Sequence, residues 1–301
     1  MHKIGIHVSN GPIDYADLER MISVGAKHYT LLHDQSPYML RLVGSGAQTC
    51  LVRYYAKAVL DRNAYEYAQE VVTAAQQWSI WSRDLVFANE ANLDYEGGQG
   101  WDNPRQVAEW MMTVADYIRD LAPTMRLHAP AFSPVGNWWQ YFAELMRYQG
   151  HFDAVDLHCY GTFQGMSDIV RAAKSQTSKP LFISECNGPG TLDFFQWIES
   201  DPQVIGATYF TWFWANPDLP GWAGDLRGSV LEREMRDYIS SGDGGSMDDP
   251  RIAQLLAQNA LITEGFKQIL QGKFTGADGL AGTVVALQGG APLNFEITFP
   301  K

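Results

Sequence analysis

The sequence is poor in cysteine and in short metal-binding motifs. Its 301 residues include three cysteines, Cys50, Cys159 and Cys186. So sparse and odd a set is not a disulfide framework. Cys159 and Cys186 fall on strands that we expect to be neighbours, so a bridge between them stays open, although buried free thiols are the favoured interpretation. No CxxC or HExxH pattern occurs, and we expect no metal or other cofactor.

Basic residues are scarce as well. The chain has 22 Lys and Arg against 34 Asp and Glu, which gives a formal net charge of −12. Nucleic acids and anionic membranes both bind basic surfaces, so neither is an expected partner. No apolar stretch is long enough to span a membrane, and the first residues lack the apolar region of a signal peptide. The sequence as written predicts a cytoplasmic protein, or a secreted one whose signal has been removed.

Strand-like and helix-like segments alternate regularly along most of the chain. The strand-like runs are 3–9, 28–33, 49–56, 85–90, 126–132, 154–160, 180–185 and 205–214. The helical patterns are 15–24, 37–42, 64–78, 104–121, 138–148, 167–175, 192–200 and 230–239. Such alternation predicts a parallel sheet, and eight units in roughly 240 residues favour an α/β fold of the closed (β/α)8 TIM-barrel type. A dinucleotide-binding sheet is disfavoured, because no Gly-rich phosphate loop follows the first strand.

The C-terminal part has a different character. We place the barrel at 1–241, a Gly- and Asp-rich linker at 242–250 and an appendage at 251–301. Within the appendage, 251–271 has a helical pattern, and 283–288 and 295–299 resemble the arms of a hairpin. About sixty residues are few for an independent core. The appendage could pack on the barrel, mediate self-association or attach the protein to something larger.

Polar side chains stand at the predicted ends of several strands, where barrels of this type place their active sites. Two are glutamates that end apolar runs, Glu90 after Val86-Phe87-Ala88-Asn89 and Glu185 after Leu181-Phe182-Ile183-Ser184. An unpaired buried carboxylate is costly, so two such strand ends indicate one site that needs two carboxylates. Glycoside hydrolysis is the commonest chemistry with that requirement.

Aromatic residues fit a carbohydrate ligand. The chain has ten tryptophans and fourteen tyrosines, and aromatic faces stack on sugar rings. Trp212 and Trp214 end the eighth predicted strand, and Trp101 lies in a Gly-rich loop after the fourth. We expect one of the first two to form the floor under the sugar and Trp101 to line a subsite.

At these positions the chain resembles the clan of (β/α)8 retaining glycoside hydrolases that includes families 5 and 39. The matching residues are Asn89-Glu90 on strand 4, His158-x-Tyr160 on strand 6, Glu185 on strand 7 and a tryptophan ending strand 8. Two features depart from family 5. The arginine that family 5 has at the end of strand 2 is absent, and the nearest one is Arg53 on strand 3; Ala91 stands where proline usually follows the Asn-Glu pair.

The resemblance implies that Glu90 is the acid/base and Glu185 the nucleophile. Glu185 must be ionised to attack the anomeric carbon, and Tyr160 and Arg53 could stabilise that anion. Asn89 would bind the sugar 2-hydroxyl. His158 would bind substrate or orient a glutamate. We expect cleavage of β-linked oligo- or polysaccharide with retention, for which the two carboxyl groups should lie about 5–5.5 Å apart, rather than ~6.5–9.5 Å as in inversion.

Other interpretations stay open at this point. The two glutamates could be structural ion pairs, His158 and Tyr160 could be core residues, and Arg53 could be a structural partner of a carboxylate. His7, His33, His128 and His158 all fall on predicted strands, so a metal-dependent barrel hydrolase is one alternative. A non-catalytic carbohydrate-binding barrel or scaffold is another.

Overall fold

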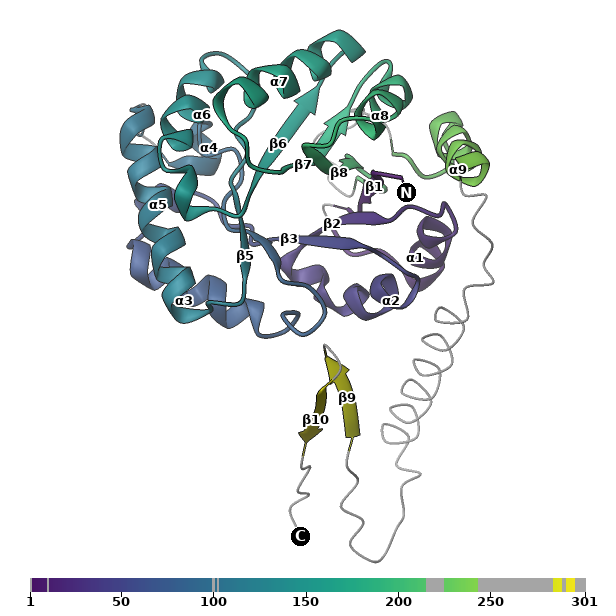
Figure 1. Cartoon of the computed structure of the whole chain (residues 1–301), viewed down its shortest axis with the longest axis horizontal. Coiled ribbons are helices and arrows are strands. Elements are labelled where there is room, and N and C mark those ends of the chain that lie inside the picture. Colours follow the sequence, from purple (N-terminus) through teal and green to yellow (C-terminus); the bar gives the residue numbers. More distant parts are fainter. Residues whose placement is uncertain are drawn as a thin grey trace, which may run out of the picture. The chain divides into compact units, whose positions relative to one another are not determined.

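Eight parallel strands close into a barrel in which each strand pairs with the next along the chain, and β1 pairs with β8 (Figure 1). The computed structural model describes residues 2–9, 11–98, 101, 103–214, 225–242, 284–288 and 291–295. The barrel strands are β1 (Ile4–His7), β2 (His28–Leu32), β3 (Thr49–Arg53), β4 (Asp84–Val86), β5 (Arg126–Ala129), β6 (Ala154–Tyr160), β7 (Leu181–Asn187) and β8 (Val204–Tyr209). The predicted (β/α)8 TIM barrel is confirmed.

Helices surround the barrel (Figure 1). They are α1 (Tyr15–Ile22), α2 (Met39–Gly44), α3 (Ala64–Ala75), α4 (Asp94–Gly97), α5 (Pro104–Leu121), α6 (Trp138–Met146), α7 (Phe163–Gln176), α8 (Thr191–Glu199) and α9 (Val230–Gly242). Short 3-10 helices occur at η1 (His33–Tyr38), η2 (Val59–Asp61) and η3 (Gln149–His151). None of the helices in these described ranges is long and apolar enough to cross a membrane.

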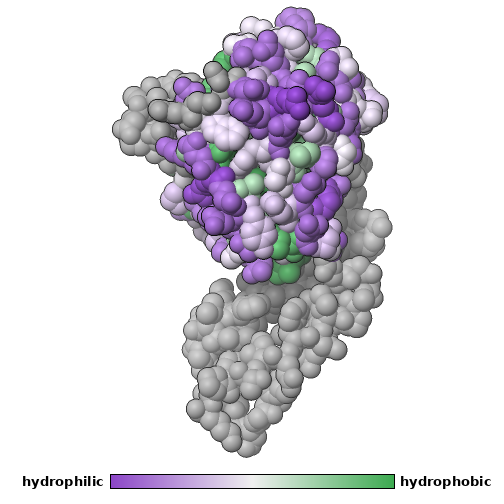
Figure 2. Space-filling view, turned by 90° about the vertical axis from the view of Figure 1, so that its left-hand side faces the viewer, coloured by the Kyte–Doolittle hydropathy of each residue, from purple (hydrophilic) through white to green (hydrophobic). Residues whose placement is uncertain are grey.

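Helix α5 shows how the sequence sets these elements. The Asn103 side chain accepts a hydrogen bond from the backbone N–H of Arg105, and Pro104 occupies the first turn, where its missing N–H costs nothing. The helix buries one apolar stripe, which includes Val107, Met111 and Val114. The side of the molecule shown in Figure 2 is mostly hydrophilic, with hydrophobic residues in small separate spots among the coloured residues.

Several predicted strands extend beyond their ladders. The longest predicted strand, 205–214, was too long, because β8 ends at Tyr209. Beyond that point the chain stays beside β1 through single contacts. The backbone N–H of Trp212 donates to the His7 carbonyl at 2.9 Å, and Ser9 and Phe213 form an isolated bridge. These contacts hold the residues that follow Tyr209 beside the end of β1.

All three cysteines are buried and free, as favoured from the sequence. Cys159 and Cys186 are register partners on β6 and β7 without being bonded to each other. The Cys186 thiol lies 3.3 Å from the Thr208 carbonyl instead. These thiols are part of the packed core around the barrel.

The chain divides into two compact units, Met1–Asp248 and Asp249–Lys301. In the second unit, β9 (Val284–Gln288) pairs antiparallel with β10 (Ala291–Phe295), and Gln288 lies opposite Ala291. The hairpin is thus present, but its second arm begins earlier than the predicted 295–299. The helix predicted at 251–271 lies outside the described residues.

Candidate active site

Strand β6 places three polar side chains on the inside of the barrel. Asp156, His158 and Tyr160 alternate along the strand, so they share one face. Asp156 accepts hydrogen bonds from the Ser184 backbone N–H at 3.1 Å and from its hydroxyl at 2.8 Å. It therefore braces β7 rather than facing a substrate. His158 and Tyr160, nearer the strand's C-terminal end, both contact glutamates.

A bulge in β7 turns two consecutive side chains to the same side. Leu157 pairs with Ile183, but the next residue of β6, His158, pairs with Glu185, so Ser184 is extra. A bulge of this kind re-aims the following side chain. As a result both Ser184 and Glu185 reach Arg53 inside the barrel. This irregularity, rather than plain alternation, sets the direction of Glu185.

Arg53, the last residue of β3, is the centre of the polar cluster. It is only 2% exposed. Its Nη1 donates to Glu185 Oε1, and its Nη2 donates to Ser184 Oγ at 2.6 Å and to His158 Nε2 at 2.9 Å. A guanidinium can only donate, so Nε2 of His158 must accept and the ring proton lies on Nδ1.

Glu90 lies beyond the end of β4 in an uncommon backbone conformation. Its φ is +39°, in the left-handed region, which costs a non-glycine residue on the order of 1–3 kcal/mol. The backbone N–H of Glu90 donates to the Ala131 carbonyl after β5 at 3.1 Å, which helps to hold this conformation. Its carboxylate Oε1 accepts from His158 Nδ1 at 2.7 Å.

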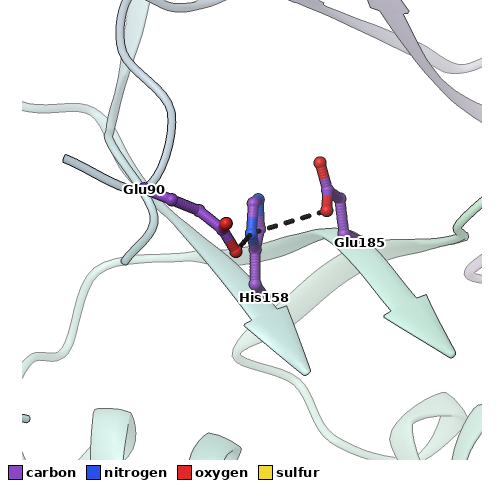
Figure 3. A group of neighbouring side chains, drawn as sticks. All are labelled: Glu90, His158 and Glu185. Atoms are coloured by element: carbon purple, nitrogen blue, oxygen red, sulfur yellow. Dashed lines mark hydrogen bonds and ion pairs between the residues drawn. The ribbon is translucent and has the colours of Figure 1, made fainter. Parts of the chain in front are cut away.

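Glu90, His158 and Glu185 form one group, with the imidazole between the two carboxylates (Figure 3). His158 Nδ1 lies 3.5 Å from Glu185 Oε2, and the nearest ligand atoms of the three residues all lie within 4.8 Å of one another. The Tyr160 hydroxyl donates to Glu185 Oε2. Glu185 is therefore held through both oxygens, by Arg53 and by Tyr160, whereas Glu90 accepts from His158.

Two groups bonded to Arg53, Glu185 and His158, have pKa values that are shifted in opposite directions. Burial opposes the charge of Glu185, but His158, Arg53 and the Tyr160 hydroxyl lower its pKa to about 2. Burial also opposes a charged His158, yet Glu185 and Glu90 raise the pKa of its ring. The Arg53 N–H directed at Nε2 opposes that rise. Burial lowers the pKa of the nearby His7 to about 3, which keeps it neutral.

The same three residues are the group in the described part of the chain that could hold a metal ion. The arrangement of Arg53 weighs against a cation there. Its guanidinium binds both Glu185 and His158, and so already supplies positive charge to two of the three ligands. A divalent ion would have to displace or repel it.

The structure brings five of the predicted site residues together and places a sixth beside them. The five are Glu90, Glu185, His158, Tyr160 and Arg53. Asn89 precedes Glu90, and its Oδ1 is buried without a hydrogen-bond partner among the described residues. A buried acceptor without a partner in the protein can accept a hydrogen bond from a hydroxyl group of a ligand.

The expectation for Trp212 was wrong. Its side chain is 0% exposed and packs within the core, so it cannot form the floor under a sugar. The sequence predicts that Trp212 lies at the end of the strand, but it does not predict the direction in which the side chain points. Trp214 is partly exposed, contacts the Phe210 ring at 5.7 Å and remains the candidate for that floor. Trp101 is partly buried and donates from Nε1 to Asp61 at 3.2 Å; its place in a subsite stays a prediction.

This difference between tryptophans predicts a difference in stability. Trp212→Ala should lower the free energy of unfolding by about 3–5 kcal/mol, because it removes a buried aromatic side chain and leaves a cavity. Trp139 is 58% exposed, so Trp139→Ala should change it by less than about 0.5 kcal/mol. Urea unfolding of the three proteins measures both values. A small loss for Trp212→Ala would contradict its place in the core.

Glu96 of α4 also lies near this group and was missed in the sequence. It is 6% exposed, and its Oε1 accepts from the Tyr55 hydroxyl at 3.1 Å. Burial, Glu90 and Glu185 raise the pKa of Glu96 to about 7, against the opposing effects of Tyr55 and Arg53. The residue follows no apolar strand, so the strand-end pattern could not identify it. The nearest signal is its position six residues after Glu90.

Comparisons with solved structures agree with this fold. The chain aligns with XacCel5A at 12% identity and a TM-score of 0.55, covering 80% of this chain and 99% of that one. It aligns with AbfB, a family 51 α-L-arabinofuranosidase from Bifidobacterium longum, at 9% identity and a TM-score of 0.56, covering 78% and 72%. A monomeric β-xylosidase from Caulobacter crescentus CB15 aligns at 11% identity and a TM-score of 0.51, covering 70% of this chain. The chain spans 60% of that protein's length.

The sequence itself carries the family assignment. No curated protein sequence matches the chain. The sequence family described as the glycosyl hydrolase catalytic core matches residues 61–218, just over half of the chain. The matched region runs from before β4 to beyond β8, and so includes both Glu90 and Glu185. The resemblance to (β/α)8 glycoside hydrolases is thereby confirmed, and the chain belongs to the glycosyl hydrolase catalytic core family.

Proposed function

We propose that the protein is a retaining glycoside hydrolase that cleaves β-linked oligo- or polysaccharide, with Glu185 as nucleophile and Glu90 as acid/base. The observation that carries the proposal is the short separation of the two glutamates. Their nearest oxygen atoms lie within 4.8 Å of each other. A pair this close fits the roughly 5–5.5 Å between the carboxyl groups of retaining enzymes better than the ~6.5–9.5 Å of inverting ones.

The surroundings of the two carboxyl groups support this division of roles. A nucleophile must be ionised, and Glu185 has a pKa of about 2 with Arg53 and Tyr160 on its oxygens. Glu90 accepts from His158 Nδ1 and has no Arg or Lys side chain bonded to it among the described residues. Of the two carboxyl groups, Glu185 is thus the one paired with a guanidinium, which suits the nucleophile, and Glu90 is left for the acid/base role.

Catalysis would then take two steps. In the first, a Glu185 oxygen bonds to the anomeric carbon while the glycosidic C–O bond breaks, and Glu90 gives its proton to the departing oxygen. In the second, Glu90 takes a proton from water, and the water oxygen bonds to the anomeric carbon as the Glu185 ester bond breaks. Each step inverts the configuration at the anomeric carbon, so the two steps together restore the starting configuration. Asn89, Trp214 and Trp101 would contact the substrate.

The β-linkage rests on the neighbours' names. One aligned structure is a β-xylosidase, and XacCel5A is also known in complex with cellopentaose. The test is release of reducing ends from β-glucans, xylans, mannans and galactans, with the anomer of the first product followed by proton NMR. We expect the β-anomer to appear first. First formation of the α-anomer would exclude retention, and equal release by Glu90→Gln would exclude Glu90. Release that requires an added divalent cation would favour a metal-dependent hydrolase.

The acid side of the pH profile depends on the contacts of Glu185. Because its pKa is about 2, kcat/KM of the wild type should not fall between pH 6 and pH 4 through loss of the nucleophile. Tyr160→Phe removes a hydrogen bond to the anion, which raises that pKa and moves the acid limb upward. We expect kcat/KM to drop about 10- to 100-fold as well. An unmoved acid limb in Tyr160→Phe would mean that Tyr160 does not stabilise the ionised nucleophile.

A further inference from the structure

Glu96 is a buried carboxyl group near the two glutamates, and the two-step reaction does not use it. Its Oε1 accepts from the Tyr55 hydroxyl at 3.1 Å. Its Oε2 is buried and has no hydrogen-bond partner among the residues that the structure describes. Buried polar atoms normally have partners, so one left over calls for an explanation such as a ligand.

The backbone fixes α4, and with it Glu96, relative to Glu90. The N–H of Leu93 donates to the Glu90 carbonyl at 2.9 Å, and the N–H of Gly97 donates to the Leu93 carbonyl at 2.8 Å. Gly97 packs against Ala91 so closely that a side-chain Cβ would lie 2.1 Å from the Ala91 carbonyl oxygen. Glycine is required there, and the close contact sets Glu96 firmly beside the end of β4.

The charges around Glu96 determine its protonation. The groups that act on it are Glu90 after β4, Arg53 and Tyr55 at the end of β3, Glu185 on β7 and Tyr95 on α4, while Asp61 of η2 lies at the far end of α4 against Gly98. Burial and the two neighbouring glutamates raise the pKa of Glu96 to about 7, although Tyr55 and Arg53 oppose the rise. Glu96 therefore carries a proton in mildly acidic solution.

The hydrogen bond from Tyr55 settles which oxygen carries that proton. Oε1 accepts from the tyrosine hydroxyl, so the proton of the neutral acid lies on Oε2. Oε2 is then a buried donor that still needs an acceptor. A carboxylic acid kept neutral by its surroundings can donate a hydrogen bond that a carboxylate cannot.

We propose that Glu96 is a specificity-determining residue, a neutral carboxylic acid whose Oε2–H donates a hydrogen bond to a hydroxyl oxygen of the bound carbohydrate next to Glu90. The inference rests on the proposed function for its ligand class. It adds a third acidic residue that recognises substrate and takes no part in bond cleavage. It also makes substrate affinity depend on pH through a group that neither catalytic glutamate supplies.

The test measures binding of a thio-linked oligosaccharide, which cannot be cleaved, made from the sugar of whichever polymer the wild type hydrolyses. Calorimetry from pH 5 to pH 9 would compare wild type, Glu96→Gln, Glu96→Ala and Asp94→Asn. The glutamine keeps an acceptor for Tyr55 and a donor that does not titrate. Asp94 is an exposed acid on the same helix and serves as the matched control.

We expect wild type and Asp94→Asn to lose about tenfold in affinity between pH 6 and pH 9, as Glu96 ionises. Glu96→Gln should bind equally well across that range, and Glu96→Ala should bind about tenfold more weakly than wild type at pH 6. The same loss with pH in Glu96→Gln as in wild type would overturn the proposal, because another group would then be titrating. So would an affinity of the wild type that does not change with pH.

Thermal unfolding separates this inference from the proposed function. The folded-state pKa of Glu96 is raised, so its ionisation destabilises the fold as pH rises through 7. The Tm of the wild type should therefore fall from pH 5 to pH 8 relative to Glu96→Gln. If no polymer is cleaved or bound, the proposed function fails, while this relative fall would still support a neutral Glu96. Parallel Tm profiles would overturn the neutral acid whether or not the enzyme is active.

Discussion

Glu185→Ala is expected to lower kcat by about 10⁴-fold or more on the best polymer of the panel, because it removes the atom that would bond to the anomeric carbon. Part of any loss could come from unfolding, since the change leaves the buried Arg53 without its main carboxylate partner. Glu185→Gln, which keeps the shape, and Glu70→Ala, which removes an exposed carboxylate, are the controls. Rates should be measured below the unfolding temperature of each variant.

Rescue by azide separates the two glutamates. In Glu185→Ala the small anion can occupy the space of the missing carboxylate and attack the anomeric carbon, which would give the α-glycosyl azide from a β-linked substrate. In Glu90→Ala the glycosyl ester on Glu185 still forms, and azide attacks it from the other side to give the β-glycosyl azide. The opposite pairing of product and variant would mean that the two roles are exchanged. If both variants kept the activity of the wild type and azide had no effect on either, neither glutamate would have its proposed role.

Much of the barrel could be predicted because its strands have both faces buried. Every residue of β7 is buried, and such a strand appears in the sequence as a short continuous apolar run. Helix α5 was predicted with its observed ends, since Asn103-Pro104 marks its start without ambiguity. Glu90, His158, Tyr160 and Glu185 were identified because charged or polar side chains at the ends of such runs have no packing role.

What could not be predicted depends on contacts between distant segments. The bulge that lets Ser184 and Glu185 both reach Arg53 is a feature of the pairing between β6 and β7, and no local signal marks it. The burial of Trp212 follows from its backbone bond to β1, which carries it inward. Glu96 becomes notable only once α4 lies beside Glu90, so its raised pKa has no counterpart in the sequence.

Arg53→Met is expected to lower the free energy of unfolding by about 3–5 kcal/mol at pH 7. Arg53 is 2% exposed and binds Glu185, Ser184 and His158, so the change leaves a buried carboxylate and two buried acceptors without their donor. Arg41→Met is the matched control. It breaks an ion pair with Glu19 in which both side chains are more than a third exposed, and such pairs contribute at most about 1 kcal/mol.

The deficit of Arg53→Met should depend on pH in a definite direction. In the wild type the folded-state pKa of Glu185 is depressed to about 2, so this group stabilises the fold above the pKa of the unfolded chain and loses that contribution as pH falls toward 2. Without the guanidinium that pKa rises, and Glu185 can take up a proton in the folded variant at mildly acidic pH. The difference in stability between wild type and Arg53→Met should therefore shrink as pH falls from 7 to 3 in urea unfolding. A difference that stays constant over this range would mean that Arg53 stabilises the barrel by packing rather than by its charge, and that the anion of Glu185 owes its stability to Tyr160 and His158.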